Sequence, residues 1–337
     1  MSQLETGVSY FANRWFHHFV RDLDEMISHG CTFVVHTFSE NDYLFARGTI
    51  GRFFRATRDA GLGCWADPWG LMGLFGGEAF SKFVARNPDA CQVLSDGRIV
   101  PAACPSAQET RAAMKDWIDA ALEAGSDTIL WDEPHLFIPE WEGADFAPPE
   151  AWACRCPRCT ERFRSDLGGD MPPELTPELQ AFRQNLLLEF LGEMIAYAKA
   201  QGANNAVCLL PVGEGSREAL PWERVSALPG IDIFGTDPYW IIFERDVEEF
   251  VAEQTRKVVE VCQASGIRPH IWAQAFKVPA GRESEIEVAL TTAKAEGATI
   301  LAAWGYRGCE ALSQIACEKP EIAWETIGRA FSRLRSR

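Results

Sequence analysis

Short apolar runs that close in polar or acidic residues recur along the whole chain, and an amphipathic segment follows most of them. The apolar runs have the length and the β-branched or aromatic content of buried strands. They lie at residues 7–11, 31–38, 61–68, 128–133, 206–211, 231–237, 270–275 and 298–304. Apolar residues spaced by three and four positions, which indicate helices, cover residues 14–28, 50–60, 110–124, 177–201, 247–265, 283–296 and 320–335.

This alternation of strands and helices predicts one α/β domain, a (β/α)8 (TIM) barrel that takes up residues 1–337. The alternation of strands and helices is interrupted twice, by residues 70–108 and 136–175. These segments are rich in Gly or Pro and follow the third and fourth strands. We therefore expect two long insertions on the face of the barrel where the strands end. A doubly wound open sheet would need a Gly-rich phosphate loop after an early strand, and the sequence has none.

The charge balance limits the range of ligands. Lys and Arg number 32 against 48 Asp and Glu, which gives a formal net charge of -16. Such a chain repels nucleic acid and anionic membranes, so we expect a neutral or cationic ligand and neither of those partners. No apolar run approaches the roughly 18 residues of a membrane-spanning helix, and the polar start of the chain has no basic segment before an apolar one. We expect a cytoplasmic protein without an organic cofactor.

The fourth predicted strand ends in two adjacent acids, Asp132 and Glu133, followed by Pro and His. Catalytic residues of such barrels lie at the carboxyl ends of the strands, and hydrolysis of a glycosidic bond needs two carboxyl groups beside it. We predict Glu133 as the general acid. Asp237, which ends the sixth strand and is also followed by Pro and an aromatic residue, is the first candidate for its partner, and Glu214 is the second. On a regular strand Asp132 would point away from Glu133. Asp132 would then orient a loop, or it would itself be the inward-facing catalytic carboxylate if the strand ends one position earlier.

Flat aromatic rings and hydrogen-bonding groups gather at the other strand ends. An indole ring stacks on the apolar face of a sugar, whereas carboxylates and amides bond its hydroxyls, so these residues predict a neutral sugar or oligosaccharide as substrate. The candidate contacts are His36, Asp67, Trp69, Trp131, His135, Tyr239, Trp240, Trp272, Gln274, Trp304 and Tyr306. The alternative role of the Trp residues is to fill the core of a large barrel.

The function predicted from these residues is glycoside hydrolysis. One alternative is a metal-dependent sugar isomerase, epimerase or lyase, in which Glu133, Asp237 and the two histidines His36 and His135 would hold a divalent ion. A second alternative is a carbohydrate-binding pseudo-enzyme that has kept the ring of aromatic residues and lacks a nucleophile.

Three of the eleven cysteines lie within six residues, at Cys154, Cys156 and Cys159. Closely spaced thiols in a reducing compartment favour a closed tetrahedral zinc site over disulfides. Cys104, in the other insertion, is the expected fourth ligand, and Cys91 is the alternative. A site with four protein ligands has no open position for a substrate, so we expect a structural zinc ion that joins the two insertions.

Three motifs together carry a resemblance to a known family: Cys104-Pro-Ser with Arg111, Trp131-Asp-Glu-Pro134, and the cysteines of residues 154–159. They resemble barrel glycosidases of the family 42 β-galactosidase type. The resemblance implies a structural zinc ion on the cysteines, a catalytic acid/base at Glu133, and a homo-oligomer, which relatives often form. This chain departs from the family at Asp132, where the family has Asn, and near Gln274, where the family has its nucleophilic Glu.

Overall fold

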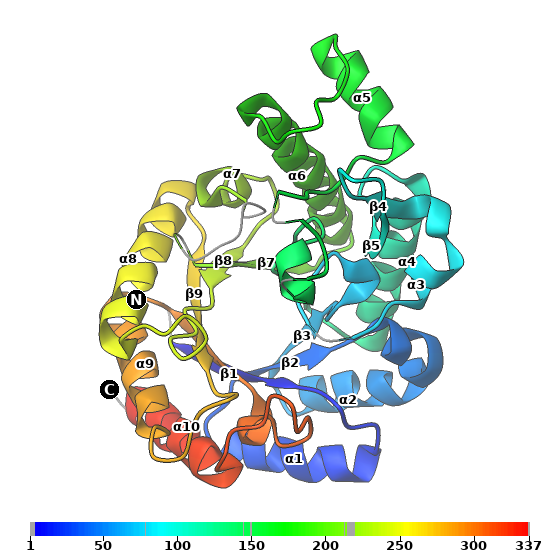
Figure 1. Cartoon of the computed structure of the whole chain (residues 1–337). Coiled ribbons are helices and arrows are strands. Elements are labelled where there is room, and N and C mark those ends of the chain that lie inside the picture. The colour runs from blue at the N-terminus through cyan, green and yellow to red at the C-terminus, as the bar shows by residue number, and fades with distance from the viewer. Residues whose placement is uncertain are drawn as a thin grey trace.

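The computed structural model describes residues 4–77, 79–143, 145–148, 150–211, 213 and 220–335. Parallel strands close into a barrel in the order β1-β10-β9-β8-β7-β6-β3-β2, which confirms the predicted (β/α)8 architecture (Figure 1). The barrel strands are β1 (Glu5–Tyr10), β2 (Phe33–Thr37), β3 (Gly63–Asp67), β6 (Thr128–Asp132), β7 (Asn204–Leu209), β8 (Ile233–Thr236), β9 (Arg268–Gln274) and β10 (Ile300–Trp304).

A helix separates each barrel strand from the next, and the helices form an outer ring around the sheet (Figure 1). They are α1 (Phe16–Ser28), α2 (Arg47–Asp59), α4 (Gln108–Ala124), α6 (Pro177–Ala200), α7 (Trp222–Ser226), α8 (Val247–Ser265), α9 (Ser284–Ala295) and α10 (Pro320–Arg335). Among the residues that the structure describes, no helix is long and apolar enough to cross a membrane.

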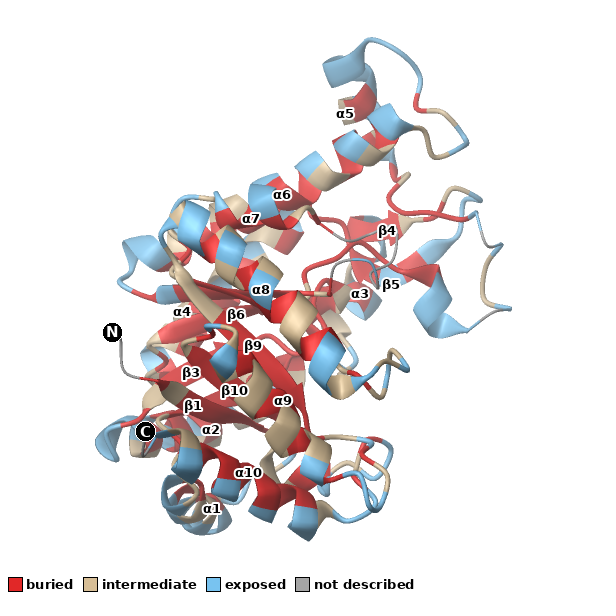
Figure 2. Ribbon diagram, turned by 90° about the vertical axis from the view of Figure 1, so that its left-hand side faces the viewer, coloured by how far each residue is buried: buried red, intermediate tan, exposed pale blue. Residues whose placement is uncertain are grey.

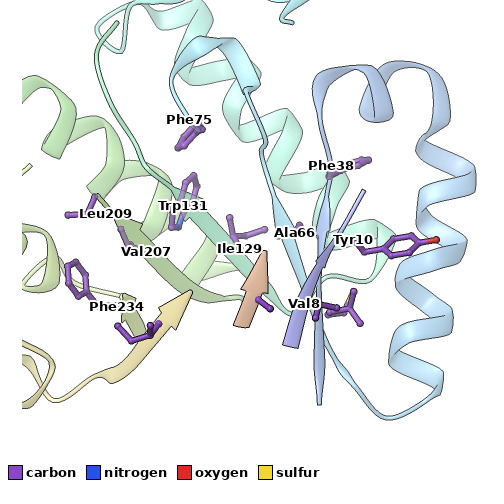
Figure 3. Packing of buried hydrophobic residues seen from close by; sticks show 14 of the residues in the cluster. Val8, Tyr10, Phe38, Ala66, Phe75, Ile129, Trp131, Val207, Leu209 and Phe234 are labelled. Carbon is purple, nitrogen blue, oxygen red and sulfur yellow. The ribbon is translucent and has the colours of Figure 1, made fainter. Parts of the chain in front are cut away.

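Side chains alternate between two cores because successive residues of a strand point to opposite faces of the sheet. In β6, Ile129 and Trp131 belong to the layer between the sheet and the helices, part of which is drawn in Figure 3. Leu130 instead joins Trp65 and Trp272 in the cluster that fills the barrel. Burying a large apolar side chain stabilises the fold by about 1.5–3 kcal/mol. The same alternation decides which strand-end residues can face the mouth of the barrel.

The two insertions pack on each other and form a further hydrophobic cluster beside the barrel. The first contains α3 (Lys82–Arg86) and an antiparallel hairpin of β4 (Cys91–Val93) and β5 (Ile99–Ala103). The second contains α5 (Pro157–Leu167), and a bridge between Leu94 and Ala153 joins the two insertions. Figure 2 shows α5 and the adjoining end of α6 projecting from the body of the protein, with much of their surface exposed.

Candidate active site

The two acids at the end of β6 point toward the same neighbour, Gly76. Glu133 has a left-handed backbone (φ 42°), and its amide donates to the carbonyl of Cys208 over 2.9 Å. A regular strand would send Asp132 and Glu133 to opposite faces. Instead, a Cβ atom at Gly76 would lie 2.9 Å from Oε2 of Glu133 and 3.2 Å from Oδ2 of Asp132. A left-handed conformation at a residue other than Gly costs about 1–3 kcal/mol, and it is often found at functional sites.

Asp237, just beyond the end of β8, is buried and hydrogen-bonded to the side chain of Glu133. Burial raises the pKa of Asp237 well above its ordinary value of 3.8, and the negative charge of Glu133, the hydrogen bond and the charge of Asp132 raise it further. Two carboxyl groups in contact cannot both ionise easily, so the pair retains one proton well above the usual carboxyl range.

A cavity of about 290 Å³ lies at this end of the barrel and is lined largely by aromatic side chains. Trp69 and Trp304 stand on either side of Phe11, with ring centres 5.4 Å and 5.8 Å from it. The ring of Trp69 rests on Gly77, where a Cβ atom would come within 1.8 Å of the indole Cδ1 atom. The lining residues are Trp69, Gly77, Asp132, Glu133, Trp141, Leu210, Asp237, Tyr239, Ile242, Phe243, Phe276, Trp304 and Ile315.

Six of the predicted site residues therefore line one cavity. They are Glu133, Asp132, Asp237, Trp69, Tyr239 and Trp304. Glu214, the second candidate for the partner carboxylate, lies outside the described residues.

Three predicted substrate contacts instead lie on the outer side of the sheet. His36 bonds Thr57 over 2.9 Å in the layer below α2, and its burial lowers the imidazole pKa to about 3, so the ring is neutral. The indole of Trp131 donates to Asn205 over 2.9 Å. The indole of Trp240 donates to Glu285 over 2.7 Å, with the ring fully buried.

The remaining predicted contacts position the loops around the cavity or fill its floor. Asp67 is buried and accepts from the amide of Trp69 over 3.0 Å, so it holds the chain that carries this indole. Gln274 accepts from the amide of Ile241 and donates to the carbonyl of Phe276, each over 3.0 Å. It therefore connects the loop after β8 to the loop after β9.

Three further predicted contacts have partners of their own. The imidazole of His135 bonds the carbonyl of Glu133, and burial lowers its pKa to about 4. Trp272 is buried inside the barrel with its ring centre 5.4 Å from that of Trp304. The hydroxyl of Tyr306 donates to Glu25 over 2.5 Å, on the α1 side of the barrel.

The glycine pair Gly76-Gly77 and the aromatic Phe276 are parts of the site that the sequence analysis missed. The pair lies inside the first insertion, for which the sequence predicts a loop-rich segment with a short helix near Phe80. Two consecutive glycines are a signal for close backbone approach. What they approach, the two carboxylates on one side and Trp69 on the other, depends on the fold.

Four buried cysteines, Cys104, Cys154, Cys156 and Cys159, meet where the two insertions join, and their sulfur atoms all lie within 4.8 Å of one another. Cys104 Sγ lies 3.5 Å from that of Cys159 and 3.7 Å from that of Cys156. A tetrahedron with metal–sulfur bonds of about 2.3 Å has edges of about 3.8 Å, so this group could hold one metal ion. Cys91 is not in the group, because its thiol bonds the carbonyls of Val84 and Asn87.

One side chain connects the insertion that carries Cys104 to the loop that follows Glu133. Gln92 of β4 donates to the carbonyl of Ala103, next to Cys104, and accepts from the amide of Phe137, each over 3.0 Å. Gln92 is fully buried, so both bonds are shielded from water. The position of the loop at residues 133–137 thus depends on the packing of the insertions.

No protein-family model matches the chain, and neither does any curated protein. Its structure is similar to the endo-1,4-β-mannanase of Rhizomucor miehei (TM-score 0.66, 12% identity, covering 99% of this chain and 96% of that chain). It is also similar to the catalytic domain of β-amylase from Paenibacillus polymyxa (TM-score 0.61, 11% identity, 90% and 92%). An L-ribulose 3-epimerase matches at a TM-score of 0.50 (14% identity, 99% and 96%). Such low identities show the fold alone.

Proposed function

We propose that the chain is a glycoside hydrolase that acts on a neutral sugar or oligosaccharide, with Glu133 as general acid/base. The observation that carries this proposal is the hydrogen-bonded pair of Glu133 and Asp237 in an aromatic-lined cavity at the barrel mouth. Glycoside hydrolysis needs a carboxyl group that keeps its proton near neutral pH. Burial and the charge of Glu133 raise the pKa of Asp237, which moves the loss of the proton of this pair to higher pH.

In this proposal the proton shared by the pair passes from Glu133 to the leaving oxygen of the substrate as the glycosidic bond breaks. A water molecule then adds to the anomeric carbon and returns a proton to the pair, so that hydrolysis is complete. Asp237 raises the pH at which the pair gives up its proton. Asp132, beside the same cavity, faces the positive charge that develops on the sugar ring as the bond breaks. The indole rings of Trp69 and Trp304 offer flat surfaces for the apolar faces of the sugar.

We also propose that the cysteine quartet binds zinc as a structural ion. All four donors are thiols, which suit zinc, and they fill a tetrahedron without an open position. The ion would join Cys104 of the first insertion to the three cysteines of the second. Its contribution to the reaction would be indirect, through the position of the loop after Glu133.

The test of the hydrolase proposal is to replace Glu133 by Gln and to assay aryl glycosides and neutral oligosaccharides. We expect the wild type to cleave some of these substrates and Glu133→Gln to be at least a hundredfold slower, because the amide cannot give a proton. Glu142→Gln, an exposed change outside the cavity, should keep full activity. Full activity of Glu133→Gln would disprove the assignment.

Two other outcomes would point to the alternative functions. Rapid loss of a sugar isomerase or epimerase activity on adding EDTA would favour a divalent ion at the mouth. Among the described residues, however, the cysteine quartet is the one group of three or more potential ligands that fits a single ion. Binding of sugars without turnover across the whole panel would favour a pseudo-enzyme.

A further inference from the structure

A second and larger cavity, of about 710 Å³, lies beside the one that holds the carboxyl groups. Trp69 and Ile315 line both cavities, so the two spaces adjoin at these side chains. The larger cavity lies among the chain segments that follow β1 and β2, the first insertion around Phe80, and residues 312–315. A substrate bound at Glu133 could therefore continue past Trp69 into it.

The walls of the larger cavity combine exposed aromatic rings with uncharged polar groups. Trp15 and Phe80 are 66% and 90% exposed, and both line the cavity. An aromatic ring held in solvent beside a cavity is suited to stack on a flat, partly apolar ligand. The polar side chains that share the lining are Asn13, Thr37, Ser39, Asn41, Ser313 and Gln314.

The lining has no net charge among the described residues. Arg14 and Asp42 are its charged side chains, and they form an ion pair of 2.9 Å with each other. His36, whose ring lies on the outer side of the sheet against Thr57, also borders the cavity, and its lowered pKa of about 3 keeps the imidazole neutral. A phosphorylated or acidic ligand would find no unpaired cation on these walls, whereas an uncharged polyhydroxylated ligand fits their chemistry.

We propose that the larger cavity binds further sugar units of a linear, neutral oligosaccharide whose reacting unit lies at Glu133. Trp15 and Phe80 are the stacking platforms for these units, and Trp69 lies at the passage between the two cavities. The inference rests on the proposed glycoside hydrolase function and adds to it that the preferred substrate is longer than a single glycosyl unit.

The experiment compares substrates of different length in Trp15→Ala and Phe80→Ala. The probes are a short aryl monoglycoside and neutral manno-, cello- and malto-oligosaccharides from disaccharide to hexasaccharide. For the wild type, kcat/KM should rise with chain length. Each variant should lose roughly three- to tenfold of kcat/KM on the longer substrates and nothing on the monoglycoside, because one stacking contact is removed.

Phe45→Ala is the matched control. Phe45 is similarly exposed at 65%, yet it lies on the π-helix Asp42–Ala46 and does not line the cavity. It should leave the dependence on chain length unchanged. Since all three side chains are largely exposed, none of the three truncations removes a core contact, and unfolding is not the expected cause of any effect.

Direct binding separates this inference from the proposed function. Indole fluorescence of the inactive Glu133→Gln variant is titrated with the same oligosaccharides, with and without Trp15→Ala. Tighter binding of the longer sugars that Trp15→Ala weakens supports the larger cavity as a saccharide site even where no substrate is turned over. Equal affinity for all lengths, or an effect of Phe45→Ala equal to that of Trp15→Ala, overturns the inference while leaving hydrolysis at Glu133 intact.

Discussion

Asp237 hydrogen-bonds Glu133 across the mouth of the barrel, from the end of β8 to the end of β6. The two strands are not neighbours, because β7 lies between them. The contact therefore spans the end of β7, and it involves a residue with a left-handed backbone, Glu133. It also makes the protonation of either acid depend on the other.

The raised pKa of Asp237 predicts how stability depends on pH. The folded chain binds this proton more tightly than the unfolded chain does. The resulting stabilisation is fully present below the ordinary pKa of 3.8 and is lost as the pH rises through the folded-state value. The Asp237→Asn substitution leaves no titrating group at this position, so the variant should not lose this stability as the pH rises. Urea unfolding at a series of pH values should show a decline in the wild type, by up to about 1.4 kcal/mol per pH unit, that the variant lacks.

The exposed Asp24→Asn is the control for that series and should reproduce the wild-type slope. Identical slopes for Asp237→Asn and the wild type would show that Asp237 is ionised in the folded protein. The same variant should move the alkaline limb of the activity profile to lower pH, since Glu133 then loses a negatively charged neighbour.

The left-handed backbone at Glu133 predicts that the variants Glu133→Gly and Glu133→Ala differ in stability, although both lose activity. Glycine adopts a φ of 42° without the strain that a side chain brings. Glu133→Gly should therefore be about 1 kcal/mol more stable than Glu133→Ala, and both should be inactive. Chemical denaturation measures the difference. An Ala variant as stable as the Gly variant would contradict the left-handed conformation.

Gly77→Ala should displace the ring of Trp69 and impair sugar binding. The added Cβ would come within 1.8 Å of the indole, at a backbone φ of 115° that also disfavours a side chain. Gly97→Ala separates the two effects, because Gly97 has a similar φ of 92° and nothing within 4 Å of its Cβ position. We expect at least a tenfold rise in KM for Gly77→Ala alone. Similar KM values for Gly77→Ala and Gly97→Ala would show that the position of the Trp69 ring does not affect sugar binding.

Removal of the metal should loosen the insertions. We expect the purified protein to contain one zinc ion per chain, measured by elemental analysis, and Cys156→Ser to contain much less. At a free metal concentration a thousandfold above Kd, the ion stabilises the folded state by about 4 kcal/mol, so its loss should lower Tm clearly. Cys91→Ser changes a buried thiol outside the quartet and should keep the metal. A metal-free wild type with the same Tm would refute the zinc proposal.

Much of the fold follows from the sequence, because each barrel strand is a short apolar run and most of the surrounding helices have an apolar stripe. Predicted and observed strands agree closely, as for residues 128–133 and Thr128–Asp132. Helix α7 has five residues, too few to show an apolar period, and it was missed. The hairpin β4–β5 and helix α5 were missed too. These elements are short, Pro-rich at their borders, and stabilised by packing between the insertions, which no local pattern reveals.

At the site, the sequence indicates the acids better than it indicates the aromatic contacts. Asp132, Glu133 and Asp237 meet in one cavity because strand ends converge on one face of a barrel. Trp131 was a poorer choice, since it alternates with the inward residues Leu130 and Asp132 and so faces the helices. Strict use of the two-residue alternation of a strand would also have placed His36 on the helix-facing side of the barrel sheet. The contact of Asp237 with Glu133 is accompanied by a left-handed backbone at Glu133. Amino-acid conformational preferences do not predict that conformation at a Glu.

The pair Gly76-Gly77 touches two parts of the site at once, with the carboxylates against the first glycine and the indole of Trp69 against the second. Any shift of this dipeptide changes the surroundings of the carboxyl groups and the position of the Trp69 ring together. In the proposed hydrolase, the proton affinity of the carboxyl pair and the preference for a particular sugar would therefore change together. A laboratory selection for a new sugar that alters this loop should also alter the pH optimum.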